Sequence, residues 1–201
     1  MNSYVKTALA VVMSACTVSM AVAQDKVISV GINGDIRSTD PGVNRDDNTD
    51  AVMMHIVEGL VAFGEDTRIA PLLASAVDIS PDGLRYTFTL RDGVRFQNGE
   101  VLTADDVQWT WQRYLDPKTQ WRCLAEFDGR GAAKIVDIAS PDPKTVVFTL
   151  DQANGLFLAA MARPDCAGSG ILHPDSLAAD GSWRAPIGTG PFTLGRWQKG
   201  Q

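Results

Sequence analysis

The chain contains 201 residues, enough for one ordinary domain or for one domain and part of another. Hydrophobic residues make up 45% and charged residues 21%, values typical of globular proteins, which excludes a wholly disordered chain. The 18 basic residues against 24 acidic ones give a formal net charge of -6, without a basic stripe, so no nucleic-acid partner is expected. The only two histidines, His55 and His173, form no HExxH motif, so we expect neither a histidine-rich metal site nor a metal cofactor.

Residues 1–23 have the order and length of a secretory signal peptide. Lys6 supplies a positive charge, an apolar run begins at Ala8, and Ala21–Ala23 matches the A-x-A pattern of a cleavage site. A membrane anchor is the alternative, but polar residues interrupt the run, which is short for a span. A lipoprotein signal at Cys16 is another alternative, preceded by a poor match to its motif. We expect export with cleavage, and therefore a periplasmic protein.

Two cysteines, Cys123 and Cys166, remain after the expected cleavage. Two cysteines in an oxidising compartment most often pair, and the chain-entropy relation puts the stabilisation by this bond at about 4 kcal/mol. Two free buried thiols are the alternative. Neither cysteine has a catalytic partner motif nearby.

The start of the mature chain has the pattern that opens an α/β unit. Alternation over Lys26–Ile32, with both faces apolar or small, predicts a strand buried between helices. A polar loop follows over residues 33–50, and Asn48 or Thr49 is the expected cap of a helix that continues to Leu60.

The middle of the chain carries turn and strand signals. Ser80–Gly83 is a turn, and residues 84–90 alternate as a half-buried strand. Asp92–Gly93 predicts a hairpin turn that leads into a return strand over Val94–Phe96. Asn98–Gly99 predicts another turn.

An amphipathic helix is expected between Thr103 and Pro117. Thr103 and Asp106 have the spacing of a capping box, and Pro117 ends the helix. The apolar face of the helix consists of Val107, Trp111, Tyr114 and Leu115.

A second turn-and-strand unit follows. Ser140–Asp142 repeats Ser80–Asp82, and Phe148–Leu150 repeats Phe88–Leu90. Two units do not make a solenoid, and we expect them to share one mixed sheet. Later segments predict a helix over residues 154–161, a loop over 164–174, a helical turn over 176–180 and a turn into a strand over 188–197.

The loop between Asn44 and Asp47 is the least easily dismissed polar cluster, because ligands bind at loops that follow strands in α/β sheets. The candidate ligand-binding residues are Asn44, Arg45, Asp46 and Asp47. A solvated loop is the alternative. The other adjacent pair, Asp105 and Asp106, is explained by the start of its helix, where negative charge is favoured.

The remaining motifs do not predict an enzyme. Gly188–Gly190 lacks the lysine of a phosphate loop, and Gly168–Gly170 lacks the spacing of a nucleophile elbow. A histidine such as His55, on a predicted helix, is usually a surface or core residue. Without a nucleophile beside a base, we expect no catalytic residues and no cofactor.

The mature chain resembles the N-terminal part of the extracytoplasmic solute-binding proteins of ABC importers, in family 5, which includes dipeptide and oligopeptide binders. The stretches that carry the resemblance are Val57–Val61, Ile69–Ala74, Ser80–Phe96, Asn98–Gly99 with Leu102–Val107, and Gly188–Phe192. The run from Ser80 to Phe96 is highly specific. Gln97 stands where the family often has His or Lys.

The resemblance implies an α/β fold of the type II periplasmic-binding-protein kind, with two lobes and a subdomain inserted in the first. Residues 24–58 would start the main lobe, residues 59–186 would form the inserted subdomain, and residues 187–201 would return to the main lobe. The second lobe would be missing, and with it the acidic residue that holds a peptide's amino terminus in such proteins.

The function implied by the resemblance is the capture of a peptide or related solute in the periplasm for an ABC permease in the inner membrane. Opines, sugars and nickel chelates are alternative ligands within the family, and the protein would act as a monomer. A short structural or chaperone-like periplasmic protein is the rival class.

Overall fold

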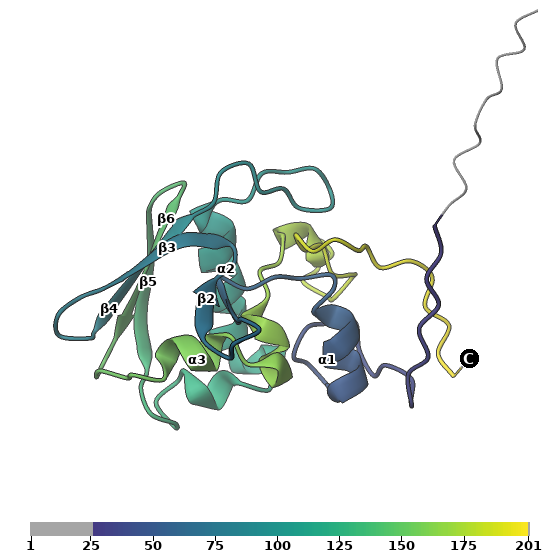
Figure 1. The fold of residues 1–201 in the computed structure, drawn as a ribbon, viewed down its shortest axis with the longest axis horizontal. Coiled ribbons are helices and arrows are strands. Elements are labelled where there is room, and N and C mark those ends of the chain that lie inside the picture. Colours follow the sequence, from purple (N-terminus) through teal and green to yellow (C-terminus); the bar gives the residue numbers. More distant parts are fainter. Residues whose placement is uncertain (1–25, 201) are drawn as a thin grey trace, which may run out of the picture. The chain divides into compact units, whose positions relative to one another are not determined.

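A four-stranded antiparallel sheet dominates the computed structural model, which describes residues 26–200 (Figure 1). Its strands follow the order β3 (Ala74–Ile79), β4 (Arg85–Leu90), β6 (Thr145–Leu150) and β5 (Ile135–Asp142). The two repeated sequence units therefore do share a sheet, with β4 beside β6. The expected mixed sheet is wrong, because short hairpin connections join β3 to β4 and β5 to β6, and such connections impose antiparallel pairing.

The remaining elements are small. A two-stranded sheet pairs β1 (Val61–Phe63) with β2 (Ile69–Pro71). Helix α3 covers Phe157–Met161, and the 3-10 turns are η1 (Pro117–Thr119), η2 (Leu124–Glu126), η3 (Pro164–Ser169) and η4 (Pro174–Ser176). Between residues 26 and 200, no helix is long and apolar enough to cross a membrane.

Strand β4 confirms the predicted alternation. Tyr86, Phe88 and Leu90 are buried, while the residues between them are exposed or half-buried. Helix α2 (Ala104–Leu115) contributes Trp111, whose ring meets Phe148 of β6 edge-on at 5.2 Å. Burial of each such ring is worth about 1.5–3 kcal/mol, which makes this aromatic contact a main source of stability.

The capping box of α2 is present as predicted. The carboxylate of Asp106 accepts hydrogen bonds from the Thr103 backbone N–H at 2.8 Å and from the Thr103 hydroxyl at 2.7 Å. The helix ends at Leu115, and Pro117 begins a 3-10 turn. Pro117 has no N–H with which to continue the α-helix.

The predicted hairpin at Asp92–Gly93 is wrong. β4 pairs with β3 and β6, so no edge of β4 is free to receive Val94–Phe96. The hairpin-like turn is instead at Asn98–Gly99, where Arg95 and Val101 form an isolated bridge.

Helix α1 (Asp47–Met53) starts earlier and is shorter than predicted. Asp46 is its cap, in place of Asn48 or Thr49, because the Asp46 carboxylate accepts the Thr49 N–H at 2.9 Å. The expected extension to Leu60 is not helical. Residues beyond α1 remain buried in a second cluster that contains Ile36, Met53, Ile56, Val57, Ala167 and Leu172.

Two further predicted strands do not form. Residues 26–31 make up the described part of a separate unit, and neither they nor Ile32 are in a strand. Residues 188–197 are likewise outside any strand. A periodic segment becomes a strand only when a neighbouring strand completes its ladder, and alternation in the sequence does not reveal whether such a neighbour exists. The predicted signal peptide lies outside the described residues.

Candidate functional site

The four candidate ligand residues lie together at the N-terminal end of α1. Asn44 is exposed and has a left-handed backbone, with φ at 46°. The Asp46 carboxylate accepts from the Thr49 N–H and hydroxyl, and it pairs with Arg37 at 2.9 Å. The Thr49 side-chain bond is the main cause of the lowered pKa of Asp46. Asp46 therefore serves the local structure, while Asn44 is open to solvent.

Arg45 links an exposed carboxylate to a buried one. Its Nη2 lies 2.8 Å from Asp47, whose side chain is 100% exposed, and its Nε donates to Asp50 at 2.5 Å. The Asp50 side chain is only 5% exposed, and its Oδ1 atom has no partner. Burial raises the pKa of Asp50 against the opposing effect of Arg45. Sequence analysis missed Asp50, whose only signal was its place in the first turn of the helix.

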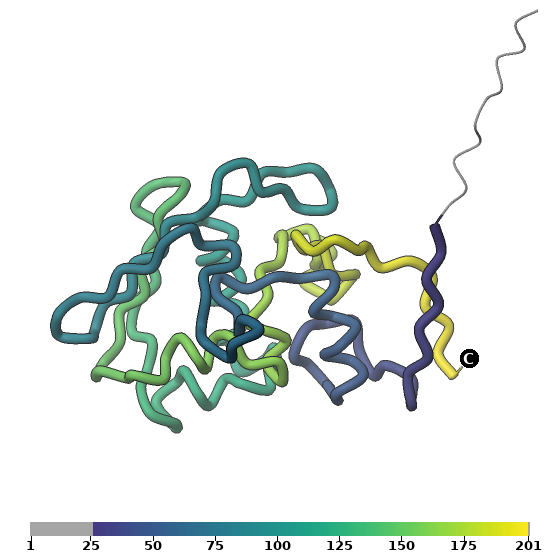
Figure 2. The backbone as a smooth tube through the Cα atoms, in the orientation of Figure 1, coloured from purple at the N-terminus to yellow at the C-terminus, as the bar shows by residue number. Residues whose placement is uncertain are grey.

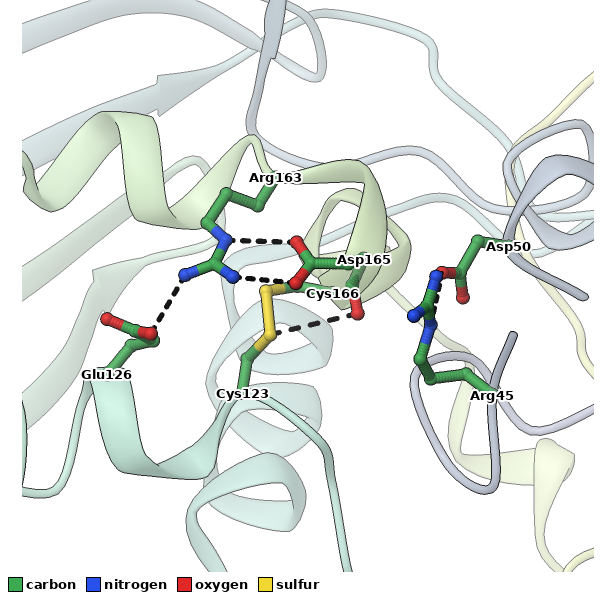
Figure 3. The surroundings of a disulfide bond; sticks show 7 residues. All are labelled: Arg45, Asp50, Cys123, Glu126, Arg163, Asp165 and Cys166. Atoms are coloured by element: carbon green, nitrogen blue, oxygen red, sulfur yellow. Dashed lines mark hydrogen bonds and ion pairs between the residues drawn. A yellow bond between two sulfur atoms is a disulfide. The ribbon is translucent and has the colours of Figure 1, made fainter. Parts of the chain in front are cut away.

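A disulfide joins Cys123 and Cys166 beside this cluster (Figure 3). The two residues are 43 positions apart, and their Cα atoms lie 5.6 Å from each other. Asp165 also lies near both sulfurs, with the three possible donor atoms within 4.8 Å. Because the sulfurs are bonded to each other, they offer no thiolate to a metal ion.

Arg163 joins the two sides of the disulfide by ion pairs (Figure 3). Its guanidinium forms a fork with Asp165, at 2.9 and 2.6 Å, and reaches Glu126 at 2.8 Å. These bonds are the main cause of the lowered pKa of Asp165, to which the charge of Arg45 also contributes. The charges around the disulfide are thus of both signs and are paired with one another.

The segment from Gly188 to Phe192 runs beside the end of α1 (Figure 2). Gly190 donates to the Ile56 carbonyl at 3.0 Å, and Phe192 donates to the His55 carbonyl at 3.2 Å. A Cβ atom on Gly190 would lie 2.6 Å from the His55 carbonyl oxygen. The glycines here therefore permit close backbone packing, which explains a motif that did not fit a phosphate loop.

Both histidines take part in local contacts. His55 Nδ1 lies 2.7 Å from the Ala51 carbonyl, and its ring meets Phe192 edge-on. His173 Nδ1 accepts from the Asp175 N–H at 3.1 Å. These contacts are those of histidines that complete turns and packing.

A hollow of about 580 Å³ lies between α2 and the turn before Trp183, and the four candidate ligand residues do not line it. Arg113 lines it, forms a bidentate ion pair with Asp40, and covers the Trp183 ring at 5.1 Å. Because the guanidinium is already occupied by Asp40, the hollow offers no catalytic pair.

Comparison with known proteins identifies the family. Residues 68–201 match the family model described as bacterial extracellular solute-binding proteins, family 5 Middle. Di/tripeptide-binding protein 4 of Pseudomonas aeruginosa (strain UCBPP-PA14) is 38% identical over 167 residues, which are 75% of this chain and 31% of the relative. The glutathione-binding protein GsiB of Salmonella typhi is 30% identical over 194 residues, 96% of this chain and 36% of the relative. The chain thus spans about a third of the length of these relatives.

Solved structures also match most of this chain and about a third of their own length. The periplasmic binding protein AgaA of A. tumefaciens R10, in complex with agropinic acid, has a TM-score of 0.73 and 34% identity, and the match covers 83% of this chain and 33% of that one. DppA of Helicobacter pylori, in complex with the peptide STSA, has a TM-score of 0.68 and 30% identity, with 83% and 36% covered.

These matches bear out the expected α/β fold of the type II periplasmic-binding-protein kind. They are with substrate-binding proteins of transport systems that act outside the cytoplasm, and not with enzymes. The chain belongs to the bacterial extracellular solute-binding proteins, family 5.

Proposed function

We propose that this chain is the front part of a periplasmic binding protein that captures a peptide or related solute and delivers it to an ABC permease. The observation that carries the proposal is the family match over residues 68–201, together with relatives named for di- and tripeptides and for glutathione. A neighbour solved with a bound peptide supports the same ligand class.

We also propose the lobe boundaries expected from the sequence. Residues 24–58 start the main lobe, residues 59–186 form the inserted subdomain, and residues 187–201 return to the main lobe. The return is supported by hydrogen bonds, because Gly190 donates to the Ile56 carbonyl and Phe192 donates to the His55 carbonyl, just after α1.

The ligand would meet the cluster at the start of α1. Asn44 and Asp47 are exposed there, and they are the residues of the four whose side chains a solute can reach with least rearrangement. Arg45 and Asp46 would hold this surface in place through Asp50 and Thr49. Binding energy would come mainly from enclosure between two lobes, with polar groups fixing the orientation of the solute.

Binding without turnover fits the chemistry of the described residues. The polar clusters described above for residues 26–200 consist of a helix cap at Asp46 and ion pairs at Arg113 and Arg163. The protein would act as a monomer, without a cofactor.

An opine is a second candidate ligand, because the neighbour AgaA was solved with agropinic acid. Isothermal titration calorimetry separates the candidates. The full-length protein that contains this chain should be titrated with di- and tripeptides, glutathione, opines, sugars and nickel chelates. We expect saturable binding of at least one peptide. Binding of an opine alone would favour the second candidate, and no heat with any of these solutes would contradict transport of this ligand class.

A further inference from the structure

Gly42 lies between the chain segments that carry the two cysteines. The Arg122 N–H donates to the Gly42 carbonyl at 2.9 Å. A Cβ atom on Gly42 would lie 2.5 Å from Nε1 of Trp121 and 3.5 Å from the Cys166 carbonyl oxygen. Gly42 has φ at +74°, a backbone conformation that a residue with a side chain adopts only with strain. The position thus requires glycine for its space and for its backbone.

Trp121 and Cys166, the residues that face Gly42, are both held in place by other contacts. Trp121 stacks on Tyr114, with ring centroids 4.5 Å apart, and on Phe127 at 5.6 Å. Cys166 is fully buried, and the next residue, Ala167, is buried in the cluster that contains Met53 of α1. The segment of Cys166 and Ala167 therefore supports α1 as well as the loop that contains Gly42.

The disulfide sets the distance between the segment of Trp121 and the segment of Cys166. The bond from Cys123 to Cys166 (Figure 3) links the segment that contains Trp121 and Arg122 to the segment of Cys166, and both segments face Gly42. The candidate ligand residues begin two positions after Gly42 and continue into α1. Displacement of either segment would therefore move Asn44 and Asp47.

We propose that the Cys123–Cys166 disulfide and Gly42 form a clamp that positions the ligand loop, residues 44–47. The clamp sets solute affinity without touching the solute, so Gly42, Trp121 and the two cysteines are positioning residues. This inference rests on the proposed function, because the affinity it controls is the one that the function requires.

The first test removes the disulfide in the full-length protein. Cys123→Ala/Cys166→Ala should weaken binding of the peptide found by calorimetry by about tenfold or more, a loss of 1.4 kcal/mol or more. Phe88→Leu is the matched control, because Phe88 is fully buried in β4, so the change lowers thermal stability and leaves the clamp intact. We expect Phe88→Leu to keep wild-type affinity at a temperature where both variants are folded.

The second test leaves the disulfide in place. Gly42→Ala should weaken binding by a similar factor, because the new methyl group meets the Trp121 indole. Trp121→Phe removes the part of the ring that the methyl group meets, so Gly42→Ala/Trp121→Phe should recover part of the affinity. A general loss of stability would not produce this recovery, since both changes remove packing or add strain.

Distinct results separate the clamp from the proposed function. Wild-type affinity in both Cys123→Ala/Cys166→Ala and Gly42→Ala would overturn the clamp and leave the function standing. If the cysteine variant does not fold, Gly42→Ala and its rescue decide. If the wild-type protein binds no solute, the function fails, and hydrogen exchange still tests the clamp. Exchange over residues 43–47 should rise in Gly42→Ala but not in Phe88→Leu, and unchanged exchange would overturn the proposal.

Discussion

Gln97 binds Gly188 through both its backbone and its side chain. The Gln97 N–H donates to the Gly188 carbonyl at 2.9 Å, and the Gln97 Oε1 accepts from the Gly188 N–H at 3.1 Å. The side-chain nitrogen of Gln97 also faces the carbonyl oxygens of Ile56, Gly190 and Phe192, at 3.0, 3.1 and 2.6 Å. One side chain thus connects three segments that are far apart in the sequence.

Gln97→Ala should lower the free energy of unfolding by about 2 kcal/mol, because several backbone groups lose their partner in a half-buried place. Urea unfolding followed by circular dichroism measures the change. Gln152→Ala is the control, since Gln152 is exposed and bonds only to the Ala132 carbonyl. Equal losses in the two variants would contradict the special position of Gln97.

Gln97→Lys should be better tolerated than Gln97→Ala. The amide nitrogen has two N–H groups for three carbonyl oxygens, whereas an ammonium group has three, and this gain offsets part of the lost bond from the Gly188 N–H to Oε1. We expect the lysine variant to recover at least half of the stability that alanine loses in the same urea experiment. A lysine variant less stable than the alanine variant would show that the carbonyl groups cannot accommodate the ammonium.

Gly190→Ala should destabilise the protein by about 2 kcal/mol or more, since its methyl group would meet backbone atoms that cannot move aside. Gly195→Ala is the matched control, because a Cβ there meets nothing within 4 Å. Thermal unfolding of both variants measures the difference. A stable Gly190→Ala variant would mean that the segment from Gly188 to Phe192 does not pack as closely as the structure shows.

The loss of folding stability at acid pH should depend on Asp165. Hydrogen bonds from Arg163 lower the pKa of Asp165 in the folded state, so its stabilisation is present above the ordinary aspartate pKa and is lost as pH falls through the folded pKa. Asp165→Asn should therefore cost about 1 kcal/mol at pH 7, and the cost should shrink as pH falls below the ordinary aspartate pKa. Urea unfolding across this pH range measures the difference, and a constant difference would contradict the assignment.

Asp50 provides the opposite sign. Burial raises its folded pKa, so the charged form costs stability above that pKa, and the cost disappears as pH falls through it. Carboxyl carbon NMR should find Asp50 titrating above the ordinary aspartate range and Asp165 below it. The reverse order would show that Arg45 outweighs burial at Asp50.

Asp47→Asn should change solute affinity while leaving the free energy of unfolding within about 0.5 kcal/mol, because the side chain is fully exposed. Asp137→Asn, an exposed aspartate on β5, is the control and should alter neither quantity. Calorimetry and urea unfolding measure the two effects. Equal affinity in both variants would remove Asp47 from the proposed ligand surface.

Local signals predicted the parts of the fold that depend on neighbouring residues. The capping box at Thr103 and Asp106, the stop at Pro117 and the alternation of β4 all involve partners within a few positions. Strand neighbours do not have such local signals, which is why the alternating segment at Lys26–Ile32 was misassigned as a strand.

The candidate site shows the same division. The sequence identified Asn44–Asp47 as a polar loop and favoured the pairing of Cys123 with Cys166, which the structure confirms. It could not reveal that Asp50 anchors Arg45 or that Gly42 lies between Trp121 and Cys166, because these contacts arise from the tertiary fold.

The pairing of β3 with β4 and of β5 with β6 has a consequence for the order of folding. Each hairpin closes a short loop, so it can form as soon as its own residues are free to fold. The bond between Thr189 and Glu58 joins residues 131 positions apart and must wait for nearly the whole segment. Assembly is thus expected to run from the hairpins, through formation of the Cys123–Cys166 bond, to the contact between Thr189 and Glu58.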